Sequence, residues 1–365
     1  MGRENAPGAR RKARTRSPSV YTGRRFTRLR FPPTVRLLCS AVRFAVPPLF
    51  LLTFALLAGC DEPGSRTKVI VGDSGVPVVA PRTTSTDPLR PVKAGALNRK
   101  LIRECSGFAA SKKYPGVFWT LSDSGDSARL FAIDATGRTV PNDAGFTFAG
   151  IPVTGAKNID WEALTIDDRG RLLIGDFGNN LSARHDLCLY VLETEPNPAK
   201  SGPTPRARRV PFRYADQAAI PDPMKNHDGE AMFAWRGDVY VLTKEWRATG
   251  AVVHRIDMTA SGDVPKPTTP VCRFESHGMV TDAAVSPDGK RLAILTYTGI
   301  WVFDFPTGAA DRNPLGGRVL YRPVIFPLLS WQVEAVAFAD ADSLLIGNEE
   351  GDIYRIKISE LAPAE

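Results

Sequence analysis

Glu162-Ala-Leu-Thr-Ile-Asp and Glu334-Ala-Val-Ala-Phe-Ala are the stretches that decide the fold, because each opens a unit that recurs along the chain. A unit begins with a polar residue, continues as a short apolar run, and passes through a polar turn into a second apolar run. The five units begin at Ser106, Glu162, Glu230, Asp282 and Glu334. Repeats of about 40–50 residues with several strands each are typical of β-propeller blades.

The repeat predicts an all-β, five-bladed β-propeller over residues 98–365. The last unit lacks an outer strand, and we expect residues 98–104, just before the first unit, to supply it and remove the open sheet edges. Six blades are an alternative that requires a degenerate repeat. An open β-sandwich is a second alternative, although sandwiches rarely carry such a repeat.

The charge of the chain is unevenly distributed. The 365 residues include 47 Lys and Arg and 39 Asp and Glu, a net charge of +8, which taken alone indicates a polyanion binder. Residues 1–59 hold twelve of these bases and a single acid, Glu4, so the rest has 35 bases and 38 acids. We therefore expect no nucleic-acid partner. The 43% hydrophobic content excludes wholesale disorder and predicts a buried core.

The basic leader ends in an apolar stretch, residues 44–58, followed by Cys60 in Leu57-Ala-Gly-Cys. The stretch is too short to be a good spanning helix. The Leu-Ala-Gly-Cys sequence resembles the lipobox of bacterial lipoproteins. That resemblance implies that residues 1–59 are a signal peptide and that Cys60 is lipidated, which makes the membrane a partner. An ordinary N-terminal anchor that happens to end in Gly-Cys is the alternative.

The segment after the cysteine indicates location and tethering. Asp61 resembles the signal that retains lipoproteins at the inner membrane, so we expect the periplasmic side of that membrane within the cell envelope. The outer membrane and the cell surface remain alternatives. Residues 60–97 are rich in Pro, Gly, Ser and Thr and are expected to be a flexible linker.

The first residues of the units should meet at one mouth of the propeller channel, because inner strands start on the same face. The predicted metal ligands are Ser106, Glu162, Glu230, Asp282 and Glu334. Crowded carboxylates repel one another and must take protons, find bases or bind a cation. Ca²⁺ accepts six to eight oxygen ligands and is the expected cofactor. Alternatively, backbone amides and Arg side chains hold the acids as packing devices.

The ends of the second strands and nearby loops predict a ligand site on the same face. Its residues are Asp123, Asp176, Asn180, Arg184, Lys244, Tyr297 and Asn348. Side chains that differ from blade to blade at matched positions indicate binding of a small molecule or a protein rather than structural repetition. We expect a monomer.

Several of these segments resemble known propellers. Leu121-Ser-Asp-Ser-Gly-Asp, Asn158-Ile-Asp-Trp-Glu-Ala-Leu and Gly175-Asp-Phe-Gly-Asn-Asn resemble an uncharacterised bacterial propeller family over roughly residues 104–196. More distantly, the blade starts and Thr243-Lys-Glu-Trp resemble the calcium-dependent apyrase and phytase-like propellers. This second resemblance implies Ca²⁺ at the channel mouth and hydrolysis of phosphoesters or lactones.

Two functions follow as hypotheses. The first is a Ca²⁺-stabilised propeller that binds a ligand or a partner on its top face without chemistry. The second is a Ca²⁺-dependent hydrolase in which Glu162, Glu230 or His227 activates water as a catalytic base.

Overall fold

The computed structural model describes residues 69–71, 75–247, 250–308, 310–327 and 332–365. The predicted signal peptide and the lipidation site Cys60 lie outside these residues. The chain divides into the units Met1–Cys60 and Asp61–Glu365. Within the described ranges, helix is limited to two 3-10 turns, Gly145–Thr147 and Ile358–Glu360. No helix there is both long and apolar enough to cross a bilayer.

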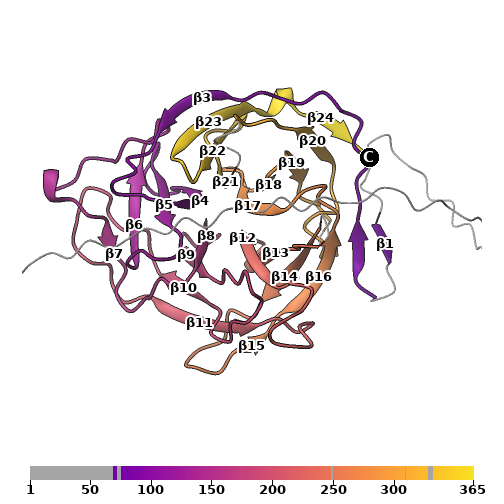
Figure 1. Cartoon of the computed structure of the whole chain (residues 1–365), viewed down its shortest axis with the longest axis horizontal. Coiled ribbons are helices and arrows are strands. Elements are labelled where there is room, and N and C mark those ends of the chain that lie inside the picture. The colour runs from indigo at the N-terminus through magenta and orange to yellow at the C-terminus, as the bar shows by residue number, and fades with distance from the viewer. Residues whose placement is uncertain (1–68, 72–74, 248–249, 309, 328–331) are drawn as a thin grey trace, which may run out of the picture. The chain divides into compact units, whose positions relative to one another are not determined.

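The unit Asp61–Glu365 is a five-bladed β-propeller, as the repeat predicts (Figure 1). Its five inner strands are β4 (Cys105–Ala110), β8 (Trp161–Ile166), β12 (Asp228–Trp235), β17 (Val280–Val285) and β21 (Val333–Phe338). Each inner strand contacts that of the next sheet, and β21 contacts β4, so the ring is closed. The sixth blade and the open sandwich are thereby excluded.

Each blade continues outward by antiparallel pairing. The second strands are β5 (Phe118–Ser122), β9 (Leu172–Asp176), β13 (Asp238–Lys244), β18 (Arg291–Thr296) and β22 (Ser343–Asn348). The third strands are β6 (Arg129–Ile133), β10 (Cys188–Leu192), β14 (Ala251–Ile256), β19 (Gly299–Asp304) and β23 (Asp352–Lys357). The fourth strands are β7 (Ile151–Pro152), β11 (Arg208–Arg213), β16 (Thr269–Phe274), β20 (Val319–Pro323) and β3 (Val92–Ala96). A two-residue strand, β15 (Lys266–Pro267), runs parallel to β11.

An N-terminal strand closes the fifth blade, but at a different place from the one expected. The closing strand is β3, which pairs with β23, and not residues 98–104. Those residues form a turn in which the Asn98 carbonyl accepts the N–H groups of Leu101 and Ile102, both at 2.9 Å. The Asn98 side chain also accepts the Lys100 N–H at 3.1 Å. Asn side chains that bond to the following backbone favour turns over strands.

Part of the segment expected to be a flexible linker belongs to the sheets. β2 (Pro77–Val79) pairs in parallel with β16 of the third blade, and β1 (Val69–Val71) pairs with β2. Leu89 forms a bridge with Val324 at the rim of the fourth blade. With β3 on the fifth blade, residues 77–97 cross three successive blades along the rim, and in Figure 1 the indigo trace passes β24 (Ala362–Ala364) and continues into β3.

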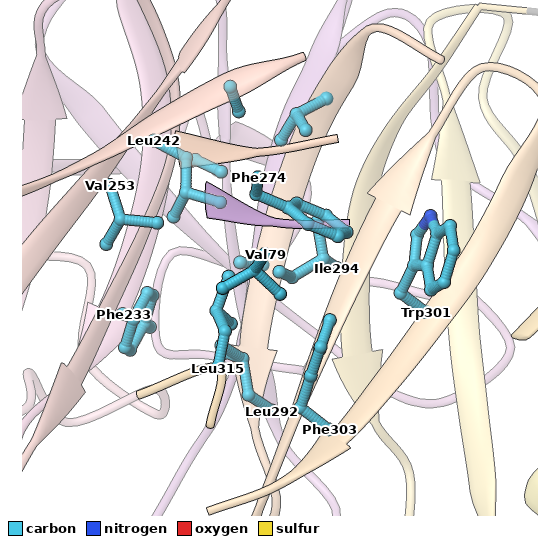
Figure 2. Close-up of a cluster of buried hydrophobic side chains, with 14 of the residues drawn as sticks. Val79, Phe233, Leu242, Val253, Phe274, Leu292, Ile294, Trp301, Phe303 and Leu315 are labelled. Carbon is cyan, nitrogen blue, oxygen red and sulfur yellow. The ribbon is translucent and has the colours of Figure 1, made fainter. Parts of the chain in front are cut away.

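The core lies between neighbouring blades. Figure 2 shows the cluster between the third and fourth blades, where Phe274 and Trp301 pack edge to face with ring centroids 5.4 Å apart. Val79 of β2 belongs to this cluster, so the rim segment contributes to the core. The remaining described cysteines, Cys105, Cys188 and Cys272, are free and buried.

The end of the channel opposite the predicted mouth is nearly filled. The cavity remaining there is about 30 Å³ in volume, and its walls include Phe108, Leu164, Ala284 and Phe338 from four inner strands. Phe108 and Phe338 are each 1% exposed. Two buried aromatic side chains therefore help to narrow this end of the channel.

Candidate functional site

A β-bulge sits at the start of each inner strand. In the second blade, Trp161 pairs with Asp176 and the next pair is Ala163 with Gly175, so Glu162 is the unpaired extra residue. Glu230 and Glu334 occupy the same position in the third and fifth blades. Bulges break the strict alternation of a strand and re-aim a side chain. This local irregularity is what brings these carboxylates together at the channel mouth.

The fourth blade differs by one residue. Its bulged residue is Thr281, and Asp282 is paired with Leu295 one position farther along. The Asp282 carboxylate accepts N–H groups from Val336 at 2.7 Å, its own neighbour Ala283 at 2.8 Å, and Phe108 at 3.4 Å. Asp282 therefore ties the inner strands of three blades through backbone amides, the packing role considered as the alternative. Its burial raises its pKa well above the usual value.

Glu230 is paired with a cation of its own blade. Lys244 Nζ lies 2.5 Å from Glu230 Oε1, and the two residues are 5% and 2% exposed. The ammonium also lies 5.0 Å from the ring centroid of Trp246 and 5.8 Å from that of Tyr297. Burial disfavours the charge, but attraction to Glu230 and other carboxylates raises the pKa of Lys244 overall. Lys244 thus remains a cation inside the mouth.

Glu334 takes a neutral partner. The Tyr297 hydroxyl donates to Glu334 Oε1 at 2.5 Å, and Oε2 is buried without a hydrogen-bond partner. Burial is the main cause that raises the pKa of Glu334 to about 8. At neutral pH this group holds its proton for a large part of the time.

The remaining part of the mouth holds three carboxylates with no base among them. Asp123, Asp160 and Glu162 each place an oxygen within 4.8 Å of the others, a spacing that fits a shared metal ion. Burial and repulsion from Asp123 raise the pKa of Asp160 to about 7. Burial, then the charges of Glu230, Asp123 and Asp160, raise that of Glu162 well above its usual value. Ser106 Oγ donates to Glu162 Oε2 at 2.6 Å.

Two loops hold this triad in place. Asn158 Nδ2 donates to the carbonyls of Ser122 at 3.0 Å and Asp123 at 2.9 Å, which joins the loop before β8 to the end of β5. Gly178 follows β9 and lies against the triad, where a Cβ would approach Glu162 Oε1 to 2.4 Å and Asp160 Oδ2 to 2.6 Å. A Cβ at this position would therefore require the loop or the two carboxylates to move.

Asp176 and Arg184 support the triad from behind. Arg184 donates to Asp176 Oδ1 at 2.9 Å and to the Gly178 carbonyl at 2.9 Å. The same Asp176 oxygen accepts the Asp160 N–H at 3.1 Å, while Oδ2 is buried and unpartnered. Asp176 is fully buried, and burial raises its pKa although Arg184 opposes the shift. These predicted ligand-binding residues position Asp160 in the structure.

Two adjacent asparagines have different roles. Asn180, the predicted binding residue, is exposed, whereas Asn179 is 2% exposed. The Asn179 side chain donates to the His227 carbonyl at 3.1 Å and accepts from the N–H groups of Ala183 and Arg184. Asn348 is also fully buried; its Oδ1 accepts the Asp352 N–H at 2.6 Å and its Nδ2 is unpartnered.

His227 contacts two aspartates that are not part of the triad. Its Nδ1 lies 2.8 Å from Asp222 Oδ2, and its Nε2 lies 3.4 Å from Asp216 Oδ1. Burial opposes protonation, but the two aspartates raise the pKa of His227 overall. Both ring nitrogens are thus occupied by carboxylates outside the channel mouth.

The predicted mouth residues fall into separate pairs and one group of three carboxylates. Glu162 is the one predicted metal ligand in the three-carboxylate group found among the described residues, and its companions are Asp123, predicted to bind a ligand, and Asp160. Sequence reasoning missed Asp160 as a site residue. The signal that could have found it is Asn158-Ile-Asp-Trp-Glu, in which an acid precedes the bulged glutamate by two residues.

Comparison with known proteins shows only distant likeness. The chain matches no model of a known protein family and no curated protein. A solved candidate gluconolactonase has 12% identity and a TM-score of 0.40, covering 78% of this chain and 99% of its own. A gluconolactonase from Xanthomonas campestris has 13% identity and a TM-score of 0.38, with coverage of 83% and 99%. A streptogramin B lyase has 10% identity, a TM-score of 0.36, and coverage of 70% and 94%. These values assign no activity and no residue role to this chain.

Proposed function

We propose that the protein binds a divalent cation, Ca²⁺, at the channel mouth through Asp123, Asp160 and Glu162. The observation that carries the proposal is the spacing of these three carboxylates, whose oxygens lie within 4.8 Å of one another. Carboxylate oxygens suit Ca²⁺, whose coordination geometry is tolerant. The ion would relieve the repulsion that raises the pKa values of the triad.

Among the described residues, the bases nearest the triad form ion pairs with other acids, although the charge of Arg184 also acts on Asp160. Lys244 is bound to Glu230, and Arg184 is bound to Asp176 and to Asp186 at 3.0 Å. Buried charges require a partner. We infer that a cation from solution is the partner of these three carboxylates.

The Ca²⁺ proposal is tested by thermal unfolding of the purified full chain. Binding to the folded state alone stabilises a protein by RT ln(1 + [L]/Kd), about 2.7 kcal/mol at 100 times Kd. We expect millimolar Ca²⁺ to raise the melting temperature, EDTA to reverse the gain, and Asp160→Asn to lose it. The control Asp263→Asn changes a fully exposed acid and should keep the gain. Identical melting curves in Ca²⁺ and EDTA would refute the proposal.

A second function, Ca²⁺-dependent hydrolysis of lactones or phosphoesters, is favoured by Glu334. Its pKa of about 8 and its unpartnered Oε2 fit a group that gives and takes a proton near neutral pH. Bound Ca²⁺ would supply Lewis-acid polarisation of a carbonyl or phosphoryl oxygen. Lys244, held between Glu230 and Tyr297, would orient an anionic group of the substrate.

A substrate panel distinguishes the enzyme from a binding protein. Sugar lactones, nucleotides and phytate are incubated with the full chain and Ca²⁺. The hydrolase proposal expects turnover that falls in both Glu334→Gln and Asp160→Asn. Ca²⁺ stabilisation without turnover on any of these substrates, or turnover unchanged in Glu334→Gln, would favour a binding platform.

We further propose that the propeller acts in the bacterial cell envelope, attached through lipid on Cys60. The support is the Leu57-Ala-Gly-Cys sequence and the basic leader before it. In cells that process lipoproteins, the wild-type chain should fractionate with membranes and Cys60→Ser should not carry lipid. Equal lipid labelling of both chains would show that Cys60 is not the attachment site.

A further inference from the structure

Two of the four histidines of the chain approach one aspartate, away from the channel mouth. His227 Nε2 lies 3.4 Å from Asp216 Oδ1, and His254 Nε2 lies 3.8 Å from Asp216 Oδ2. Asp216 and His227 belong to the segment between β11 and β12, and His254 lies in β14. The three residues therefore converge from the second and third blades.

The other nitrogen of each imidazole is held by an oxygen. His227 Nδ1 lies 2.8 Å from Asp222 Oδ2, and His254 Nδ1 lies 3.1 Å from the hydroxyl of Thr268. Metal-binding histidines almost always use the second ring nitrogen in this way, which fixes the tautomer and the ring orientation. Both Nε2 atoms are thereby presented toward the same carboxylate.

One ring nitrogen of His254 is buried without a hydrogen-bond partner. The residue is fully buried, and Nε2 makes no hydrogen bond. The pairing of β14 with β16 shifts register between Val253 and His254, and such a bulge re-aims a side chain.

The two imidazoles lie against an aromatic side chain. Tyr214 packs against both imidazoles, with ring centroids 5.2 Å from His227 and 4.8 Å from His254. A buried imidazole nitrogen without a partner is costly in such a place. The arrangement offers two imidazole nitrogens and one carboxylate as ligands, whereas the triad offers oxygen ligands alone.

We propose that His227, His254 and Asp216 form a second metal site, which takes a first-row transition ion of the zinc type. Imidazole and carboxylate ligands suit Zn²⁺, with bonds of about 2.0–2.2 Å. Ligand atoms bound tetrahedrally at that length lie roughly 3.3 Å apart, close to the separations from Asp216. The three ligand atoms are not all within 4.8 Å of one another, so binding one ion requires Asp216, which is 38% exposed, and the segment that carries His227 to move inward. Three protein ligands leave a fourth position for water or an incoming group.

The test uses Co²⁺ as a spectroscopic probe, followed by displacement with Zn²⁺. The metal-free full chain is expected to bind one Co²⁺ at this site with the visible absorption of a tetrahedral nitrogen-containing site, and Zn²⁺ should abolish it. His227→Gln and Asp216→Asn should lose the spectrum. Asp222→Asn alters the oxygen that meets His227 Nδ1 and the Asn226 N–H, and should weaken Zn²⁺ affinity by about 10–100-fold while the ligands themselves remain.

Matched variants separate this site from the carboxylate triad. His185→Gln changes an exposed histidine and should keep the spectrum, as should Asp160→Asn, which removes the triad. His254→Gln alters a buried residue, so its result counts only if circular dichroism shows a folded chain. Absence of the cobalt spectrum in the wild type, or its persistence in folded His227→Gln, would overturn the proposal.

Discussion

The channel mouth has two parts in which the buried carboxylates have different partners. In one, Glu230 has Lys244 at 2.5 Å and Glu334 has the Tyr297 hydroxyl at 2.5 Å. In the other, Asp123, Asp160 and Glu162 face one another with no base among them. The first part is compensated by the chain itself. The second depends on protons or on an ion from solution.

This difference arises from the side chains that meet the acids. The inner strands supply similar bulged acids, Glu162, Glu230 and Glu334. What differs is the residue that meets each acid: a hydroxyl from Ser106, an ammonium from Lys244, and a phenol from Tyr297. The same bulged position therefore holds an acid with a different partner in each of the three blades. Removing one partner at a time shows whether the two parts are as distinct as their contacts indicate.

The largest expected effect comes from removing the internal cation. Lys244→Met leaves Glu230 buried beside no base, and breaking a buried pair costs about 3–5 kcal/mol of unfolding free energy. The double variant Lys244→Met/Glu230→Gln should recover much of the loss, because no unpaired charge remains. Urea denaturation at neutral pH measures both. Lys290→Met, at an exposed lysine, serves as the control and should change stability by less than about 1 kcal/mol. A Lys244→Met chain as stable as the wild type would contradict the compensation.

The pH dependence of stability should reveal the proton on Glu334. Its folded-state pKa of about 8 lies above the ordinary value of 4.5, so the folded chain binds more protons than the unfolded chain between these values. Stability therefore falls as pH rises through this window, by at most about 1.4 kcal/mol per pH unit for one group. Denaturation of the metal-free protein across this range should give a shallower decline in Glu334→Gln. Parallel profiles for the two chains would mean that Glu334 is not the titrating group.

A substitution at Gly178 tests the carboxylate triad without changing the charge of the channel mouth. Gly178→Ala places a Cβ 2.4 Å from Glu162 Oε1, so the loop or the carboxylates must move. Overpacking of this kind costs about 1–3 kcal/mol. It should also weaken Ca²⁺ stabilisation by spreading the triad. Gly202→Ala, where a Cβ meets nothing within 4 Å, is the matched control. Equal melting temperatures and equal Ca²⁺ responses in the two variants would count against the close approach.

The blade repeat could be predicted because apolar runs and turns recur in the sequence with little variation. The bulges could not, since an extra residue changes pairing without changing composition. This is why Asp282 aligned with Glu162 by sequence, although Thr281 is its structural equivalent. The closing strand was misplaced by a few residues because a turn at Asn98 intervenes.

The candidate sites show the same limit. Glu162 and Asp123 could be predicted from the ends of strands, where a propeller concentrates its loops on one face. Asp160 lies just before its strand and joins the triad only because Asn158 and Gly178 fold two loops together. His254 sits inside a strand, and its approach to Asp216 depends on contact between two blades. Contacts between residues distant in sequence carry no local signal.

The smallest expected effect separates two neighbouring residues that the sequence does not distinguish. Asn180→Ala alters an exposed side chain and should change stability by less than about 0.5 kcal/mol. Asn179→Ala leaves the N–H groups of Ala183 and Arg184 without their acceptor and should cost about 1–3 kcal/mol. Because those bonds hold Arg184 against Asp176, the Asn179 variant should also reduce Ca²⁺ stabilisation, whereas the Asn180 variant should not. If Asn180→Ala lowers Ca²⁺ stabilisation and Asn179→Ala does not, the exposed Asn180 side chain contributes to the ion site. The buried hydrogen bonds of Asn179 would then not be needed for Ca²⁺ binding.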